Sequence, residues 1–236
     1  NDRYRRGEII GTGGMSDVYG ATDTVLGRDV AVKMLKVDMA RDENFRERFR
    51  QEAKNSARLN HPNIVAVYDT GAQDVGGVDV PFIVMERVIG RNLRDIVRAE
   101  GPLTPREAAG IMQPVTRALQ SSHDAGIIHR DIKPDNVLIT SHHRVKVGDF
   151  GLVRATNAEA TSDMIVGTVS YLAPEQVTGE EITPASDVYS AGIVLFELLT
   201  GTVPFSGDTP LAHATARLDS DVPAPSSRIS GVPKLV

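Results

Sequence analysis

The pattern of apolar residues changes near Gly90, and this change constrains the fold more than any other feature of the chain. Before Gly90, short β-branched runs predict strands and one amphipathic run predicts a helix. The predicted strands cover residues 8–10, 17–20, 29–35, 64–68 and 82–85, and the helix covers residues 42–59. After Gly90 helical patterns dominate, including a capping box at Thr104 and an apolar run over residues 184–199. The sequence therefore predicts an α+β protein with a small β-rich lobe over residues 1–88 and a larger helical lobe over residues 89–236.

Composition excludes several classes of protein. The 236 residues include no cysteine, which rules out a disulfide framework or a cysteine-ligated metal site and fits a reducing compartment. A formal net charge of −5 does not favour a general nucleic-acid or anionic-membrane surface. No apolar run approaches the roughly 18 residues that a membrane span needs. We therefore expect no contact with nucleic acid or membrane through this part of the chain.

A glycine cluster, GTGGMSDV at residues 11–18, lies between two predicted strands. Glycines let the backbone approach phosphate oxygens closely and present N–H donors to them. The cluster opens no helix, so it is not a dinucleotide fingerprint, and no Gly-Lys-Ser/Thr follows, so it is not a Walker loop. On its own it is weak evidence, because a hairpin with glycines is more often an ordinary turn than a phosphate site.

Two polar features favour phosphate chemistry. Lys33 lies inside a predicted strand, where it is either an exposed side chain or a phosphate-binding cation held by Glu52 of the predicted helix. The octet HRDIKPDN at residues 129–136 contains a candidate base, cations and an amide between two apolar runs. A polar segment between apolar runs indicates a loop that is held in place rather than a solvated charge run.

Two tripeptides add weaker signals. Asp149-Phe-Gly follows a predicted strand, and a carboxylate at a strand end can ligate a hard cation. Ala173-Pro-Glu lies further along the chain. Neither is informative alone, and both gain weight only from their order relative to the other motifs.

Taken in order, these pieces resemble the protein kinase family along essentially the whole chain, with a glycine loop, VAVK, HRDIKPDN, DFG and APE. Four segments of the sequence are similar to actinobacterial receptor-type serine/threonine kinases of the PknB and PknL kind. They read GTGGMSDV, FRERFRQEA, LNHPNIVAVYDTG and GIIHRDIKPDN. The resemblance implies a bilobal protein-kinase fold. It also implies an ATP-dependent serine/threonine protein kinase that autophosphorylates its activation loop and acts on protein substrates in signalling.

The resemblance assigns catalytic roles to five residues. Asp131 would orient the substrate hydroxyl and accept its proton, and Lys133 would neutralise the transferred phosphoryl group. Lys33, paired with Glu52, would bind the α- and β-phosphates of ATP. Thr168 matches the threonine that contacts the catalytic aspartate and lysine. With Lys133, it favours serine/threonine over tyrosine specificity.

The resemblance also implies a metal site and an adenine site. Asn136 and Asp149 would hold Mg²⁺, or Mn²⁺ in its place. The remaining ATP contacts would come from the glycine loop, the adenine pocket, the gatekeeper Met85 and the connector. These residues are Ile10, Gly11, Gly13, Gly14, Val18, Ala31, Met85, Glu86, Val88 and Leu138. Phe150 and His129 resemble stacked members of the regulatory spine, which Asp187 would anchor.

Regulatory residues follow from the same resemblance. Activation-loop phosphorylation is expected at Thr161 or Ser162, and secondarily at Thr156, with Arg130 as the phosphate's partner. A back-to-back homodimer of the small lobe would use three residues that match its interface in related kinases. These are Arg3, Leu26 and Asp69. The resemblance further implies a cytoplasmic location, as the cytoplasmic domain of a membrane receptor-type kinase.

Two departures from the family pattern stand out. Ser16 replaces the third glycine of the loop, as it does in bacterial relatives. The family's last two helices have no counterpart in the sequence, so Glu175 is expected to lack the arginine with which it normally pairs. Two alternatives remain open at this point, a pseudokinase that binds ATP without turnover and a small-molecule kinase of similar fold. The complete segment from Asp149 to Glu175 argues against the second.

Overall fold

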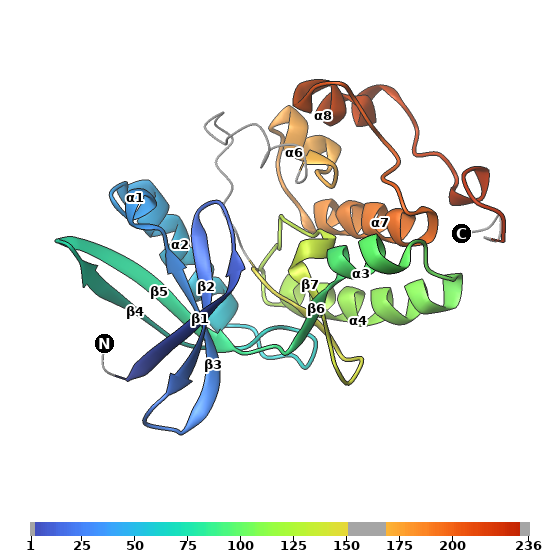
Figure 1. The fold of residues 1–236 in the computed structure, drawn as a ribbon. Helices are drawn as coiled ribbons and strands as arrows, with labels where there is room; N and C mark the ends of the chain where they lie inside the picture. The colour runs from blue at the N-terminus through green and yellow to red at the C-terminus, as the bar shows by residue number, and fades with distance from the viewer. Residues whose placement is uncertain (1–2, 151–168, 232–236) are drawn as a thin grey trace.

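The computed structural model describes residues 3–150 and 169–231, which form a smaller β-rich part and a larger helical part (Figure 1). The smaller part is built on a five-stranded antiparallel sheet in the order β1-β2-β3-β5-β4. Its strands are β1 (Tyr4–Thr12), β2 (Ser16–Asp23), β3 (Arg28–Leu35), β4 (Val67–Val75) and β5 (Val78–Glu86). Neighbouring strands in this sheet are therefore mostly joined by short turns, as the alternating sequence predicts.

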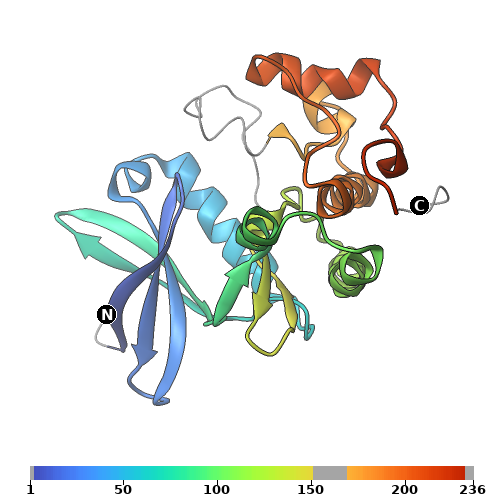
Figure 2. The ribbon, with the colours of Figure 1, turned by 45° about the vertical axis from the view of Figure 1, so that its right-hand side comes forward.

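Two helices accompany this sheet, α1 (Val37–Ala40) and α2 (Glu43–Ala57). The Asp42 side chain accepts a hydrogen bond from the Asn44 backbone and so caps the start of α2. Phe49 and Ala53, one turn apart, are buried and pack in the same core cluster as the sheet. Figure 2 shows α2 running along the sheet toward the larger part, so its inner face can reach the junction between the two.

The larger part combines a three-stranded sheet, in the order β6-β7-β8, with helices. The strands are β6 (Gly90–Asn92), β7 (Val137–Thr140) and β8 (Val145–Val147). The helices are α3 (Leu93–Glu100), α4 (Pro105–Asp124), α6 (Pro174–Thr178), α7 (Pro184–Thr200) and α8 (Pro210–Asp219), with short 3-10 turns at η1 (Pro134–Asn136) and η2 (Pro225–Ser227). The predicted capping box of Thr104 with Glu107 is confirmed at the start of α4. The predicted apolar helix is confirmed as α7.

The helices of the larger part share one apolar core, in which α4 packs against α7. Leu198 and Val115 from these helices are fully buried. Leu59 and Ile64, from the segment after α2, also belong to this core. The lobe boundary at residues 88 and 89 remains a prediction, and the α2–β4 segment packs with the larger part although it precedes that boundary.

One predicted strand is wrong in its position. The sequence predicts a strand over residues 64–68, but β4 begins at Val67. Ile64 instead forms an isolated parallel bridge with Val147, and the Val65 N–H donates to the Val147 carbonyl at 2.9 Å. The start of the apolar run 64–68 therefore contacts β8. Because β8 is far along the chain, a local sequence pattern does not indicate this contact.

The exit from the β-rich part depends on Gly90. Strand β6 starts there and pairs with β7, and a Cβ built on Gly90 would lie 2.0 Å from the Ile139 carbonyl oxygen. Only glycine permits so close an approach of the two backbones. In the part of the chain that the structure describes, no helix is both long and apolar enough to cross a membrane.

Candidate active site

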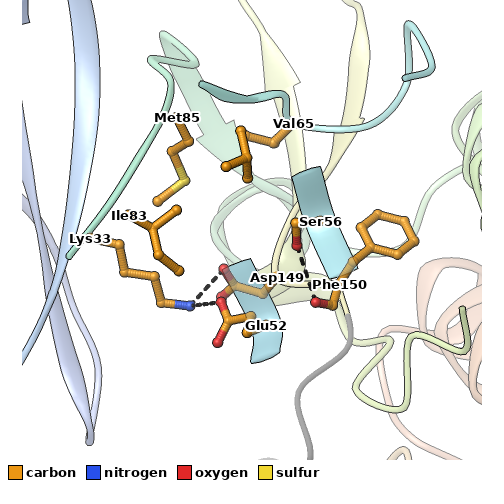
Figure 3. Close-up of a pocket in the computed structure, with 9 residues that line it drawn as sticks. Lys33, Glu52, Ser56, Val65, Ile83, Met85, Asp149 and Phe150 are labelled. Carbon is orange, nitrogen blue, oxygen red and sulfur yellow. Dashed lines mark hydrogen bonds and ion pairs between the residues drawn. The ribbon is translucent and has the colours of Figure 1, made fainter. Parts of the chain in front are cut away.

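A pocket lies at the junction of the two parts, and both polar and apolar side chains line it (Figure 3). Lys33 comes from β3, Glu52 and Ser56 from α2, and Asp149 from the segment after β8. The apolar lining includes Val65, Val67, Ile83, Met85 and Phe150. The pocket therefore gathers residues that are more than a hundred positions apart in the sequence.

Lys33 is buried and carries two ion pairs. Its Nζ lies 2.7 Å from Glu52 Oε1 and 2.9 Å from Asp149 Oδ1, as Figure 3 shows. The Lys33 side chain is only 8% exposed, so the alternative of an exposed strand lysine is wrong. Burial opposes the charge of Lys33, but the carboxylates of Asp149 and Glu52 outweigh it and raise the Lys33 pKa. The lysine is therefore a fixed cation at the pocket floor.

Asp149 has a left-handed backbone conformation, with φ at 58°. Burial alone would raise its pKa, but the charge and hydrogen bond of Lys33 bring the pKa of Asp149 below its ordinary value. The next residue, Phe150, is buried against the ring of His129, with 4.5 Å between ring centroids. The Ser56 hydroxyl donates to the Phe150 carbonyl at 3.2 Å. These contacts hold the Asp149 carboxylate toward the pocket.

The octet that contains Asp131 forms a braced loop. Lys133 Nζ lies 2.9 Å from Asp131 Oδ2, and Asn136 Nδ2 donates to the same oxygen at 3.1 Å and to the Asp131 carbonyl at 2.8 Å. Asp131 and Asn136 are both buried. The Gly148 N–H donates to the Asn136 carbonyl at 2.9 Å. The loop is thereby joined to the residue that precedes Asp149.

Asp187, in the first turn of α7, holds this loop in place through hydrogen bonds with the loop backbone. Its two carboxylate oxygens accept hydrogen bonds from the backbone N–H groups of His129 and Arg130, each at 2.8 Å. His123 Nε2 lies 2.8 Å from the same carboxylate. Arg130 has φ at 69°, a strained conformation that this network maintains. The predicted anchoring contact of Asp187 is therefore present in the structure.

The donor set suits a hard cation completed by a substrate. Asn136 and Asp149 are the two predicted ligands, and the described hydrogen bonds of the Asn136 side chain use its Nδ2 rather than its Oδ1. Within residues 3–150 and 169–231, no group of three or more His, Cys, Asp or Glu side chains could hold a metal ion by itself. Mg²⁺ usually takes one or two protein oxygens together with substrate phosphates, so an open two-residue set fits it.

The predicted adenine residues line up on neighbouring strands. In the sheet registers, Val18 is opposite Lys33, and Ala31 is opposite Met85. Leu138 lies on β7, in the larger part. The glycine loop forms the turn between β1 and β2, where the Gly13 N–H donates to the Ser16 carbonyl at 2.8 Å. The other members of the predicted set occupy β1, this turn, the end of β5 or the connector after it. They are Ile10, Gly11, Gly14, Glu86 and Val88.

A lysine that the sequence motifs do not include contacts Glu86, at the end of β5. Lys146 on β8 pairs with Glu86, with 2.7 Å between Nζ and Oε2, and also donates to the Ile64 carbonyl at 3.3 Å. It stands between the buried residues Val145 and Val147. A lysine between two apolar strand residues is the same signal that drew attention to Lys33, so the sequence did offer a clue.

Four of the predicted site residues are not covered by the described part of the chain, and Glu175 has a partner that the sequence did not indicate. Thr156, Thr161, Ser162 and Thr168 lie outside the described residues. Glu175, which was expected to lack an arginine partner, accepts a hydrogen bond from the Ser186 hydroxyl.

The three predicted dimer residues are connected by hydrogen bonds, two of them through the side chain of Asp23. Arg3 donates to both carboxylate oxygens of Asp23, at 3.0 and 2.9 Å, and to Asp69 at 3.2 Å. The Leu26 N–H lies 3.3 Å from Asp23 Oδ1, and the Leu26 side chain is 58% exposed. The structure therefore joins Arg3, Asp69 and the Leu26 backbone within a single chain.

Comparison with known proteins agrees with this geometry. The family model described as protein kinase domain matches residues 4–228. A probable serine/threonine-protein kinase of Corynebacterium efficiens is 55% identical over 97% of this chain and 35% of its own length. The probable serine/threonine-protein kinase PknB of Corynebacterium glutamicum is 55% identical over 97% of this chain and 36% of its own, and the serine/threonine-protein kinase PknB of Mycobacterium tuberculosis is 50% identical over 98% and 38%. The chain thus spans little more than a third of the length of these curated relatives. The chain belongs to the protein kinase family.

Proposed function

We propose that this chain is the catalytic domain of a serine/threonine protein kinase, which transfers the γ-phosphoryl group of ATP to hydroxyl groups of protein substrates. The observation that carries the proposal is the pairing of Lys33 with both Glu52 and Asp149, beside a loop in which Asp131 contacts Lys133 and Asn136. Phosphoryl transfer asks for positioned charges more than for covalent chemistry, and these residues supply both signs of charge.

Each charged group has a distinct task in this proposal. Asp131 orients the serine or threonine hydroxyl and accepts its proton as the hydroxyl oxygen bonds to phosphorus. The bond between the γ-phosphorus and the bridging oxygen of the β-phosphate breaks, and ADP leaves. Lys133 faces the transferred phosphoryl group, while Lys33 binds the α- and β-phosphates. Burial of Lys33 strengthens its electrostatic contribution because water does not screen it.

We assign the divalent metal to Asn136 and Asp149, with Mg²⁺ as the expected ion and Mn²⁺ as a substitute. When bound, the metal neutralises charge on the phosphate oxygens. The lowered pKa of Asp149 keeps its carboxylate ionised and available as a ligand at neutral pH.

The alternatives have less support. A pseudokinase would lack one of the groups that the chemistry needs, whereas Lys33, Asp131, Asn136 and Asp149 are all present and in contact with expected neighbours. The relatives at 50–55% identity carry the name serine/threonine-protein kinase, which supports protein substrates over small molecules. Lys133, two residues after Asp131, supports serine and threonine over tyrosine.

We further propose that the domain works in the cytoplasm as part of a membrane receptor-type kinase, and that it forms a back-to-back dimer through the region of Arg3, Leu26 and Asp69. The exposed Leu26 side chain beside the Arg3 ion pairs supports a contact surface there. Dimerisation would hold α2, which carries Glu52, inward and so favour the active state.

Transfer of radiolabelled phosphate tests the main proposal. The chain is incubated with γ-labelled ATP and a serine- and threonine-containing protein, with Mg²⁺ and with a chelator. The expected result is metal-dependent label on serine or threonine of the protein. Nucleotide binding with no label on any protein would favour the pseudokinase, and label on aminoglycosides or small alcohols but not on protein would favour a small-molecule kinase.

A further inference from the structure

Arg94, at the start of α3, lies at a meeting point of four segments. Its Nη1 is 2.6 Å from Glu197 Oε1 on α7, and its Nη2 is 3.2 Å from Asp135 Oδ2 in the catalytic loop. The same Nη2 donates to the Tyr171 hydroxyl at 2.6 Å. Arg94 belongs to none of the kinase motifs.

The cluster is closed by a further contact. The Tyr171 hydroxyl donates to Glu197 Oε2 at 2.5 Å, and the Arg94 guanidinium lies 5.3 Å from the centre of the Tyr171 ring. Tyr171 and Glu197 are buried, and the Arg94 side chain is only 15% exposed. The planar guanidinium fork can serve three partners at once, which an ammonium group cannot do in the same geometry.

Two partners of Arg94 belong to segments that are important for the proposed activity. Asp135 is the neighbour of Asn136, the proposed metal ligand, and lies in the loop of Asp131. Tyr171 comes three residues after Thr168, at the end of the segment that would face a protein substrate. Arg94 thus connects the loop that carries the chemistry to the segment that would carry the substrate.

Other contacts hold these two segments, but at different points. The Ser190 hydroxyl donates to the Tyr171 carbonyl at 2.7 Å, which fixes the backbone to α7 without reaching the catalytic loop. Gln176 donates to the Arg130 carbonyl at 3.0 Å and so joins α6 to the beginning of the loop. The Arg94 contact with Asp135 joins the other end.

We propose that Arg94 is a positioning residue for phosphoryl transfer, which fixes the Asp135 end of the catalytic loop against the Tyr171 segment. The inference rests on the proposed kinase activity and deepens it. Because Arg94 does not line the nucleotide pocket described above, its loss should spare ATP binding. Because misplacement of reacting groups is costly, its loss should slow transfer to protein.

The test compares Arg94→Ala with Arg91→Ala, a control that removes an arginine whose ion pair with Glu100 is exposed. We expect kcat/KM for a protein substrate to fall about tenfold or more in Arg94→Ala while the Kd for ATP changes by less than about twofold. Arg94→Lys, which keeps the charge but not the fork, should recover part of the loss. A kcat/KM equal to that of Arg91→Ala would overturn the proposal.

Two further measurements keep the test decisive. Asp135→Asn, at a half-exposed side chain, should also lower kcat/KM, and its effect should not add to that of Arg94→Ala. Backbone hydrogen exchange in residues 133–137 and 169–173 should be faster in Arg94→Ala than in Arg91→Ala. Unchanged exchange in both segments of a folded Arg94→Ala would overturn the proposal. Full activity of Asp135→Asn would overturn it even if Arg94→Ala failed to fold. If the parent chain transfers no phosphate, the proposed function fails, while the exchange comparison still decides whether Arg94 connects the two segments.

Discussion

The Nζ of Lys33 lies 2.7 Å from Oε1 of Glu52, so a cation on β3 is held by a carboxylate on α2. Both side chains are nearly fully buried. A buried pair of this kind is costly to break, because the remaining charge is left without compensation. The contact therefore ties the position of α2 to the position of the proposed phosphate-binding cation.

Lys33→Met should abolish phosphoryl transfer. The substitution keeps the apolar stem but removes a preorganised cation, and the loss of one such group typically lowers kcat by about 100-fold or more. It also leaves Glu52 and Asp149 without their shared partner. Transfer of labelled phosphate to a protein substrate is the measurement.

The matched control is Lys36→Met, which changes a lysine at the end of the same strand whose 3.7 Å contact with Asp17 is partly exposed. It should retain the parental rate. A Lys33→Met protein that remains as active as the control would show that Lys33 has no role in catalysis.

Asp131→Asn should lower phosphoryl transfer by about 100-fold or more, since general-base groups contribute on this scale. Asparagine keeps the shape of the side chain and can still accept from Lys133 and Asn136, so the loop should stay in place. ATP affinity should be nearly unchanged, because the proposed role of Asp131 is with the substrate hydroxyl. Turnover and nucleotide affinity are measured on one preparation, with Asp124→Asn on α4 as the control. Activity above a few per cent of the parent would contradict the role of Asp131.

The sequence predicted those parts of the fold and site that are encoded locally. The capping box of Thr104 and the apolar face of α2 are short-range patterns. The capping box appears as expected, and Phe49 and Ala53 of the predicted α2 face are buried. The strand predicted over residues 64–68 failed because Ile64 and Val65 pair with Val147, far along the chain. Local periodicity contains no information about such a partner.

In the site, too, residues in local motifs could be predicted, whereas residues that depend on long-range contacts could not. The residues of the motifs could be identified because their order and spacing are specific, and Lys33, Glu52 and Asp149 do meet. Arg94 could not be identified, since its three partners come from separate segments and it stands in an ordinary amphipathic helix. The sequence alone does not reveal that the Arg94 side chain is only 15% exposed once the helices are packed.

Asp23 should make stability sensitive to acid. The hydrogen bonds from Arg3 lower the Asp23 pKa from 3.8 to about 2 in the folded chain, although burial acts in the opposite direction. A carboxylate with a lowered folded pKa contributes stability that is fully present above its unfolded value of 3.8 and is lost as the pH falls toward about 2. The urea midpoint of the parent should therefore fall between pH 5 and pH 3 more steeply than that of Asp23→Asn. The exposed substitution Asp29→Asn should leave the parental slope intact, and equal slopes in all three proteins would contradict the assignment.

Leu26→Asp should weaken the proposed dimer. The side chain is exposed in the turn between β2 and β3, next to the Arg3 and Asp69 ion pair, and a charge there would be buried by association. Sedimentation velocity should give a larger dissociation constant for the variant, and autophosphorylation should slow at low protein concentration. Val75→Asp, at the end of β4 beside a separate turn, is the control. A parent that remains monomeric at high concentration while fully active would contradict the dimer.

The Thr161→Ala, Ser162→Ala double variant should lower activity on an added protein substrate by about tenfold or more, the scale of one or two charge-assisted contacts. Both residues lie outside the described part of the chain, whereas Arg130, the proposed partner of the phosphate, lies within it. Its backbone is fixed at φ 69° by Asp187 on one side and by Gln176 on the other. A phosphate of nearly two negative charges could bind this arginine and align the segment with Asp131.

Mass spectrometry after incubation with Mg²⁺ and ATP should find phosphate at Thr161 or Ser162 before Thr156. Thr156→Ala serves as the matched control and should reduce activity less than the double variant. Arg130→Lys separates charge from geometry, since lysine keeps the charge but cannot bind a phosphate with two parallel hydrogen bonds. It should therefore lower the activity of the phosphorylated protein more than that of the unphosphorylated protein. If the double alanine variant is as active as the parent, phosphorylation at these two residues is not the step that activates this kinase.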